Sequence, residues 1–306
     1  MRIFVTGASG WIGSAVVPEL IGAGHEVTGL ARSDASGAAL TAAGAKVVRG
    51  TVDDLDVLRD AASASDGVIH LAFKHDLAFG GDFPGAAQAD RRAADTIGDA
   101  LAGSDRPFVL AAGLIGLEPG RVATERDKPV LDGSPISMRS ATAASVLDLA
   151  ARGVRSSVVR LAPTCHGDGD NGFMAALVAI ARQKGVSGYL GDGTNRWPAA
   201  HRLDVARLFR LAVEKAPAGS VLHGAAEEGV AIRDVAEVIG RHLGLPVTSV
   251  APEASADHFA WLAGFLGSDS PASNTLTREL LGWEPVQTGL LADLDEGHYF
   301  RAPAAG

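Results

Sequence analysis

The sequence contains a single cysteine, Cys165, among its 306 residues, so no internal disulfide can form. A chain so poor in cysteine is typical of a reducing compartment, and we expect a cytoplasmic protein. Aromatic residues make up only 5% of the chain and charged residues 21%, whereas apolar residues reach 47%, which excludes an intrinsically disordered chain. No apolar run approaches the length of about 18 residues that a membrane-spanning helix needs. The N-terminal apolar run, residues 3–5, is too short for a signal peptide.

Basic residues are outnumbered as well, with 27 Lys and Arg against 36 Asp and Glu and a formal net charge of −9. An acidic chain without a basic run is a poor partner for nucleic acid or an anionic membrane. We therefore expect a small-molecule substrate. The stretch 165–170 (C-H-G-D-G-D) matches neither a zinc motif nor a calcium-binding loop, so no metal is expected.

The first half of the chain alternates short apolar runs with stretches of helical periodicity. The apolar runs predict strands over residues 2–5, 26–30, 46–48, 67–72, 108–112 and 157–161. The periodicity predicts helices over residues 11–21, 36–43, 57–64, 86–101 and 140–151. Strands that alternate with helices form βαβ units, so we expect an α/β fold with a parallel sheet over residues 1–163. The rhythm then loosens, which predicts a smaller lobe over 164–306, with 203–224 returning to the main sheet.

The most specific motif lies at the N-terminus, where residues 6–13 read T-G-A-S-G-W-I-G between a predicted strand and a predicted helix. Gly7 permits a tight turn, Gly10 lets the backbone approach a pyrophosphate, and Gly13 lets helix and strand pack closely. Backbone N–H groups at the start of the helix would then hold the phosphates. The alternative is a glycine turn that only packs the helix on the strand.

This motif resembles the fingerprint of the extended short-chain dehydrogenases/reductases, the epimerase/dehydratase-like branch of that superfamily. Three further segments are similar to this branch: V-I-H-L-A at 68–72, V-R-L-A-P at 159–163 and H-R-L-D-V-A at 201–206. The resemblance implies a Rossmann-like, doubly wound parallel sheet, a nicotinamide cofactor, a C-terminal substrate lobe and a possible homodimer. It implies cofactor contacts at Gly7, Ser9, Gly10, Trp11, Ile12, Gly13, Leu71, Ala72 and Pro163.

The end of the second predicted strand bears on the choice of cofactor. An acid there would bind the ribose 2′-hydroxyl of NAD, but the strand is followed by Arg32 and Ser33. A guanidinium binds a 2′-phosphate in bidentate fashion, and a hydroxyl adds a donor. We therefore expect NADP rather than NAD, although Asp34 is a counter-argument.

The family's usual proton-transfer pair, Y-x-x-x-K, is missing. The two tyrosines of the chain are Tyr189 and Tyr299, and no lysine occurs between residues 128 and 184. Depending on register, the tyrosine position holds Ser137, Met138 or Arg139, and the lysine position holds Ala141, Thr142 or Ala143. The serine or threonine expected on the preceding strand is replaced by alanine, at Ala112 in the best register.

Other side chains are candidates to replace this machinery. His75 titrates near neutrality and could move a proton, Arg139 could stabilise an oxyanion, and Thr142 could polarise a carbonyl. Lys74, His166 and Trp197 are candidate substrate contacts. Phe259, Trp261 and Phe265 could form an apolar substrate wall or belong to the core. Each polar candidate could equally be an ordinary loop or helix residue.

Three functions remain open from the sequence. The first is an NADP-dependent oxidoreductase that acts on a small carbonyl or hydroxyl compound with non-standard catalytic residues. The second is a catalytically inactive NADP-binding sensor or scaffold, which the joint loss of Tyr, Lys and Ser favours. The third is a nucleotide-sugar epimerase or dehydratase, which normally needs the missing tyrosine.

Overall fold

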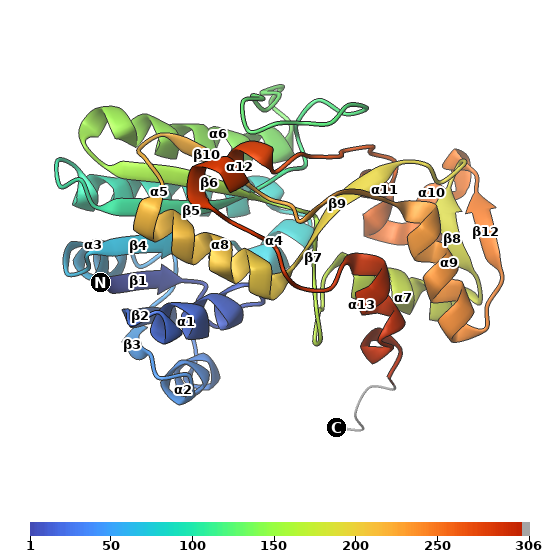
Figure 1. Cartoon of the computed structure of the whole chain (residues 1–306), viewed down its shortest axis with the longest axis horizontal. Coiled ribbons are helices and arrows are strands. Elements are labelled where there is room, and N and C mark those ends of the chain that lie inside the picture. Colours follow the sequence, from blue (N-terminus) through green and yellow to red (C-terminus); the bar gives the residue numbers. More distant parts are fainter. Residues whose placement is uncertain (302–306) are drawn as a thin grey trace.

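The computed structural model describes residues 1–301, and the last five positions of the predicted lobe, 302–306, lie outside the described residues. A sheet-based region carries the first half of the chain, and a smaller lobe stands at one end of it (Figure 1). No helix among residues 1–301 is both long and apolar enough to cross a membrane.

The main sheet has seven strands in the order β10-β6-β5-β4-β1-β2-β3, and all its pairings are parallel. Its strands are β1 (Arg2–Thr6), β2 (Glu26–Ala31), β3 (Lys46–Arg49), β4 (Gly67–His70), β5 (Pro107–Gly113), β6 (Arg155–Leu161) and β10 (Ser220–Gly224). This is the doubly wound, Rossmann-like α/β fold that the sequence predicted.

Helices cover both faces of this sheet. One face packs against α1 (Gly13–Gly22), α2 (Asp34–Ala42) and α8 (Arg202–Lys215), and the other against α3 (Leu55–Ser63), α5 (Phe83–Leu101) and α6 (Pro135–Asp148). Along β1 the side chains alternate between the two cores: Ile3 and Val5 join the first, and Phe4 joins the second. Burial on both faces explains why these strands are continuously apolar.

The smaller lobe contains two short sheets that the sequence did not predict. A three-stranded sheet joins β7 (Thr164–His166), β9 (Arg196–His201) and β11 (Glu227–Ala231), and a pair joins β8 (Ser187–Leu190) to β12 (Val247–Val250). Around them lie α7 (Phe173–Lys184), α9 (Ile232–Leu243), α10 (Ser255–Phe259), α11 (Ala263–Leu266) and α13 (Leu290–Asp295), with the 3-10 turns η2 (Pro252–Ala254), η3 (Ala260–Leu262) and η4 (His298–Phe300).

One segment of the predicted lobe packs on the main sheet instead. It contains α12 (Thr275–Leu281), which packs against β10 and α8, and Trp283, which is buried in the core of the main sheet.

Two short elements in the first region complete the fold. A short helix α4 (His75–Phe79) follows β4, and the turn η1 (Leu149–Arg152) follows α6. The helix α4 places additional side chains at the carboxyl edge of the sheet.

Candidate functional site

A cavity of about 1300 Å³ lies at the carboxyl ends of β1, β4, β5 and β6, with residues of the smaller lobe forming part of its wall. Ligands of open α/β sheets bind at this edge, where the strand order reverses. The predicted residues that line the cavity are Gly7, Ser9, Gly10, Trp11, Ile12, Gly13, Arg32, Leu71, Ala72, Lys74, His75, Arg139 and Pro163. The predicted residues that do not line it are Ser33, Thr142, His166 and Trp197.

The glycine loop is built around close backbone approaches. Gly7 adopts φ +65°, and a Cβ atom there would lie 2.7 Å from the backbone nitrogen of Ala72. A Cβ atom on Gly13 would lie 2.1 Å from the carbonyl oxygen of Gly7. The amide of Gly10 donates to that same carbonyl at 3.0 Å, which closes the turn. These contacts bring the start of α1 against the end of β1, the arrangement that presents backbone N–H groups to a phosphate.

Trp11 connects the glycine loop to the smaller lobe. Its indole Nε1 donates to the carbonyl oxygen of Cys165 at 2.7 Å, and the guanidinium of Arg202 lies 4.3 Å from the centre of its ring. Cys165 also lines the cavity, but burial raises the pKa of its thiol to about 12. The thiol is therefore protonated at neutral pH and is not an activated nucleophile.

The residues that bear on the choice between NADP and NAD follow β2, and only one of the two charged ones lines the cavity. Arg32 lines the cavity, where its exposed guanidinium lies 3.5 Å from the carboxylate of Asp76. Asp34 instead pairs with Arg49 at 2.6 Å and is not part of the lining. The hydroxyl of Ser33 accepts from the amide of Ser36 as the N-cap of α2, and Ser33 is not among the residues that line the cavity.

The structure decides the register of α6 against the cavity. Of the three possible positions for the missing tyrosine and lysine, the pair Arg139 and Ala143 lines the cavity. Ala112 at the end of β5 lines it as well. In this register, the positions at which the resemblance implies Tyr, Lys and Ser or Thr hold Arg139, Ala143 and Ala112. Thr142 lies one residue away from this helix face, is only 1% exposed and does not reach the cavity, which corrects its predicted catalytic role.

Arg139 is a half-buried cation with few partners, and its Nε atom is buried. Its guanidinium lies 4.1 Å from the centre of the Phe73 ring, one of its terminal nitrogens donates to the carbonyl oxygen of Ala111 at 3.4 Å, and its Nε has no partner. No carboxylate among residues 1–301 forms an ion pair with it. Burial lowers the pKa of Arg139, against the opposing effect of the Asp90 carboxylate. A guanidinium on the cavity wall that has donors without partners can bind a carbonyl oxygen or an anion.

His75 begins α4 with its ring between two phenylalanines. The ring centres of Phe73 and Phe79 lie 5.1 and 5.8 Å away. Although the residue keeps an exposed surface, loss of hydration, and to a smaller extent the charge of Arg139, lowers the pKa of His75 to about 4. About one ring in a thousand is then charged at pH 7. This environment keeps the ring uncharged at neutral pH, where it can take part in hydrogen bonds but is a poor carrier of a proton.

The predicted substrate contacts of His166 and Trp197 are corrected by their burial. The Nδ1 atom of His166 pairs with the Asp293 carboxylate at 2.9 Å, and the ring is fully buried. Trp197 packs in the core of the smaller lobe, where its Nε1 donates to the carbonyl oxygen of Ser268 at 3.1 Å. Lys74 does line the cavity, but its ammonium group pairs with Asp53.

The comparisons with known proteins agree with this geometry. The model of the NAD-dependent epimerase/dehydratase family matches residues 3–101. Uncharacterised proteins of Schizosaccharomyces pombe and Saccharomyces cerevisiae are each 44% identical to the chain, over 98% and 96% of it and over 100% and 98% of their own length. The chain belongs to the NAD-dependent epimerase/dehydratase family.

Among solved structures, MoeE5 in complex with UDP-glucose and NAD has a TM-score of 0.76 and 23% identity, covering 96% of each chain. The dTDP-glucose 4,6-dehydratase DesIV of Streptomyces venezuelae has a TM-score of 0.78 and 19% identity, covering 98% of this chain and 97% of DesIV, so both likenesses show the fold alone.

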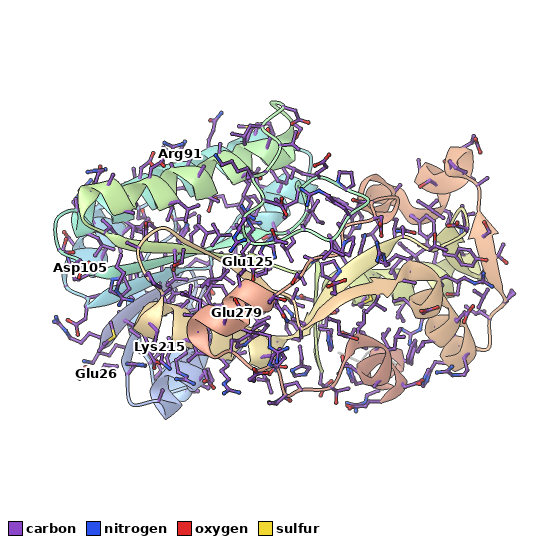
Figure 2. The ribbon with its side chains drawn as sticks, turned by 45° about the horizontal axis from the view of Figure 1, so that its top comes forward. Glu26, Arg91, Asp105, Glu125, Lys215 and Glu279 are labelled. Atoms are coloured by element: carbon purple, nitrogen blue, oxygen red, sulfur yellow. The ribbon has the colours of Figure 1, made fainter. Side chains whose placement is uncertain are left out.

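Within this family fold, the cavity also contains residues that sequence reasoning missed. The carboxylate of Glu125, which is 6% exposed, accepts from the amide and the hydroxyl of Thr277 at 2.7 and 2.6 Å. Figure 2 shows Glu125 in the middle of the molecule, while Arg91, Asp105 and Glu26 lie at its periphery. Phenylalanines form the other missed group: Phe73, Phe79, Phe83 and Phe173. Phe73 directly follows the predicted strand 67–72, a position at the carboxyl edge that could have indicated its role.

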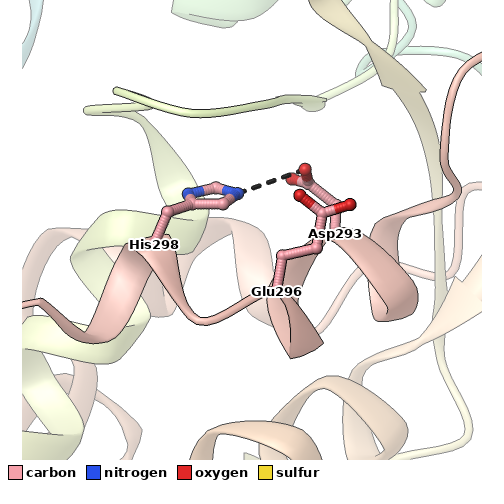
Figure 3. Close-up of side chains that lie close together, drawn as sticks. All are labelled: Asp293, Glu296 and His298. Atoms are coloured by element: carbon pink, nitrogen blue, oxygen red, sulfur yellow. Dashed lines mark hydrogen bonds and ion pairs between the residues drawn. The ribbon is translucent and has the colours of Figure 1, made fainter.

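Figure 3 shows a cluster of acidic and imidazole groups near the C-terminus, whose residues are not part of the cavity lining. Asp293, Glu296 and His298 present ligand atoms within 4.8 Å of one another. However, the two carboxylate oxygens of Asp293 are already taken by two imidazoles, those of His166 at 2.9 Å and His298 at 3.1 Å. We interpret the cluster as a bridge that attaches the C-terminal segment to β7.

Proposed function

We propose that the protein is an NADP-dependent oxidoreductase that interconverts a small carbonyl compound and its alcohol. The observation that carries this proposal is the continuity of one cavity, which is lined by the glycine loop, by Arg32 and by the half-buried Arg139. Its volume of about 1300 Å³ exceeds the roughly 300–1,000 Å³ that is usual for a pocket with one small ligand. A dinucleotide and a substrate can therefore lie in it together.

The residues present fit a dinucleotide. The absence of side chains at Gly7 and Gly13 leaves backbone N–H groups accessible where the diphosphate would lie. Arg32 would bind the 2′-phosphate, since its partner Asp76 is fully at the surface and Asp34 is turned toward Arg49. Bound there, a reduced nicotinamide supplies the hydride for a carbonyl carbon, or the oxidised form accepts one from an alcohol.

Arg139 and His75 are the residues to which we assign roles in the reaction. The guanidinium of Arg139 donates hydrogen bonds to the substrate oxygen and stabilises the negative charge that develops on it as the carbon gains the hydride. Since a guanidinium does not release its proton, a water molecule would protonate that oxygen, and the hydroxide ion left behind takes a proton from the solvent. The uncharged ring of His75 would orient this water, and the same water would take the proton in the reverse reaction, when the alcohol is oxidised.

The decisive experiment is a calorimetric titration of the purified protein with NADPH and NADH. We expect tight binding of NADPH and weak binding of NADH. The Arg32→Ala variant should bind NADPH about 10- to 100-fold more weakly, the value of a charge-assisted bidentate contact, and should bind NADH unchanged. Arg59→Ala is the matched control, because Arg59 is an exposed arginine that pairs with Asp56 and is not part of the cavity lining.

The outcomes separate the candidate functions. Binding of neither nucleotide would mean that the glycine loop only packs α1 on β1, and the oxidoreductase proposal would fall. Tight NADPH binding without turnover of any carbonyl or alcohol would favour a nucleotide sensor. Tight NADPH binding with turnover supports the proposal, and equal affinity for both nucleotides would remove the assigned role of Arg32.

A further inference from the structure

Aromatic side chains are rare in this protein but gather at one cavity. The chain has 10 phenylalanines, four tryptophans and two tyrosines in 306 residues. Five of the phenylalanines and two of the tryptophans line the cavity. We define the aromatic belt as Phe73, Phe79, Phe83, Phe173, Trp261 and Phe265.

The aromatic belt is continuous from one wall of the cavity to the other. On the sheet side, the ring of Phe73 lies 5.7 Å from that of Phe83, and His75 links Phe73 to Phe79. The ring of Phe79 then meets Trp261 of the smaller lobe at 4.9 Å. Within the lobe, the ring centre of Phe173 lies 5.4 Å from Trp261 and 5.5 Å from Phe265. These spacings are those at which aromatic rings attract one another.

The belt is not an ordinary part of the core. Phe79 keeps 46% of its surface exposed and Trp261 keeps 43%, although they are among the largest apolar side chains of the molecule. In contrast, the neighbouring Phe259 is 1% exposed and belongs to the core of the lobe. Large rings left open on the wall of a cavity lose hydration when a ligand covers them, and this gain is available to an apolar ligand.

The charged residues of the cavity lining lie on one side of the cavity. Among residues 164–301, those that line the cavity are uncharged: Cys165, Asn171, Gly172, Phe173, Val221, Trp261 and Phe265. The cations of the lining lie within residues 32–160 and include Arg126, Lys128 and Arg160, so the wall formed by the smaller lobe suits an apolar group. At the sheet end of the belt, in contrast, the guanidinium of Arg139 stacks on Phe73 at 4.1 Å and offers a donor to a single oxygen.

We infer that the substrate is an aromatic carbonyl compound, whose ring packs against the aromatic belt while its carbonyl oxygen meets Arg139. This inference rests on the proposed function, since it names the class of compound that the same cavity takes. A bound reduced nicotinamide would supply the hydride for the carbonyl carbon and water the proton for its oxygen, so the product is the corresponding aryl-substituted alcohol.

The test compares two carbonyl compounds of similar size, benzaldehyde and cyclohexanecarbaldehyde, by the rate of NADPH consumption. Variants are Phe79→Leu and Trp261→Leu, with Phe300→Leu as the matched control, because Phe300 stacks on His242 and is not part of the cavity lining. For each belt variant, kcat/KM for benzaldehyde should fall about three- to tenfold, while kcat/KM for cyclohexanecarbaldehyde changes less than about twofold. The Phe300→Leu variant should keep the ratio of the wild type. Comparing ratios between variants removes the intrinsic difference in reactivity of the two aldehydes.

A second readout does not depend on turnover. Benzamide and cyclohexanecarboxamide cannot be reduced in this way, and their binding can be followed by calorimetry and by the part of the tryptophan fluorescence change that is lost in Trp261→Leu. Preferential binding of benzamide by the wild type, lost in Phe79→Leu, supports the inference even if no carbonyl is turned over, in which case the proposed function alone fails. Equal binding of the two amides, or tighter binding of UDP-glucose than of benzamide, would overturn the inference whether or not the protein reduces carbonyls.

Discussion

The absence of a side chain at Gly13 allows the close contact between the start of α1 and the end of β1. A Cβ atom at this position would lie 2.1 Å from the carbonyl oxygen of Gly7 and 2.7 Å from the Cα of Ala8. These are backbone atoms, so they cannot rotate away as a flexible side chain would. The start of α1 would have to move from the end of β1, and the N–H groups that face the cavity would move with it.

We therefore predict opposite effects for two alanine substitutions in the same helix. Gly13→Ala should weaken NADPH binding at least about tenfold and lower the free energy of unfolding by about 1–3 kcal/mol. Gly22→Ala should leave binding unchanged and raise the free energy of unfolding by about 0.5–1 kcal/mol, because no atom lies within 4 Å of its would-be Cβ and the residue is helical. Nucleotide titration and urea unfolding measure both. Normal binding by Gly13→Ala would contradict the assigned role of the loop.

The glycine loop was predictable because its residues are contiguous and their roles are those of the backbone. Arg32 was found in the same way, from its place at the end of a strand. The directions of Ser33, His166 and Trp197 were not predictable, since each is set by a partner distant in the fold or by a local cap. His166, for example, turns to Asp293, which lies 127 residues further along the chain.

At the scale of secondary structure, α6 contributes the residues whose register against the cavity could not be predicted from the sequence. The sequence predicted a helix over 140–151, but the helix begins at Pro135, with the hydroxyl of Ser134 accepting from the amide of Ser137. A serine followed by proline is a helix-start signal that would have corrected the prediction. Even so, the periodicity of an alanine-rich helix does not identify which face meets a cavity. That face, with Arg139 and Ala143, is known from packing alone.

This helix supplies a prediction in which activity and stability move in opposite directions. Arg139→Met removes a half-buried, poorly paired charge while keeping most of the side-chain volume, so the melting temperature should stay the same or rise. At the same time kcat should fall about 10²- to 10³-fold, the usual effect of removing an oxyanion donor, with unchanged affinity for NADPH.

The neighbouring position on α6 provides the control for this prediction. Met138 is not part of the cavity lining, so Met138→Leu should keep kcat within about twofold. Steady-state kinetics and thermal unfolding of the two variants are the measurements. A loss of stability in Arg139→Met that parallels the loss of activity would show that Arg139 is a structural residue.

At the scale of the whole molecule, the sequence predicted the parallel sheet but not the sheets within the smaller lobe. Each βαβ unit is encoded by residues close in the chain, so the order of strands and helices could be read directly. The sheet of β7, β9 and β11 pairs short strands from distant segments, and its strands are too short for an alternating pattern to stand out. The return of α12 to the main sheet likewise depends on contacts made between distant parts of the chain.

His223 on β10 holds several of these distant parts together. Its Nδ1 donates to the carbonyl oxygen of Ser273 at 2.8 Å, its Nε2 lies 3.4 Å from a guanidinium nitrogen of Arg160, and its amide donates to the hydroxyl of Thr277 at 2.7 Å. Arg160 in turn donates to the carbonyl oxygen of Asp127. With a proton on Nδ1, Nε2 must accept, so a second proton would face the Arg160 charge. Burial, above all, lowers the pKa of His223 to about 4.

The stability of the molecule should therefore decline with acid in a defined window. Between pH 6.5 and about 4 the unfolded chain binds a proton at residue 223 that the folded chain does not, so the free energy of unfolding falls as the pH falls. The free energy of unfolding should therefore be lower at pH 5 than at pH 7.5. The His223→Asn variant, which can still donate to Ser273, should be less stable at pH 7.5 but should lose less stability between the two pH values. Urea unfolding of both proteins at pH 7.5 and 5.0 measures this difference, and equal losses in the two proteins would show that the pKa of His223 is the same in the folded and the unfolded chain.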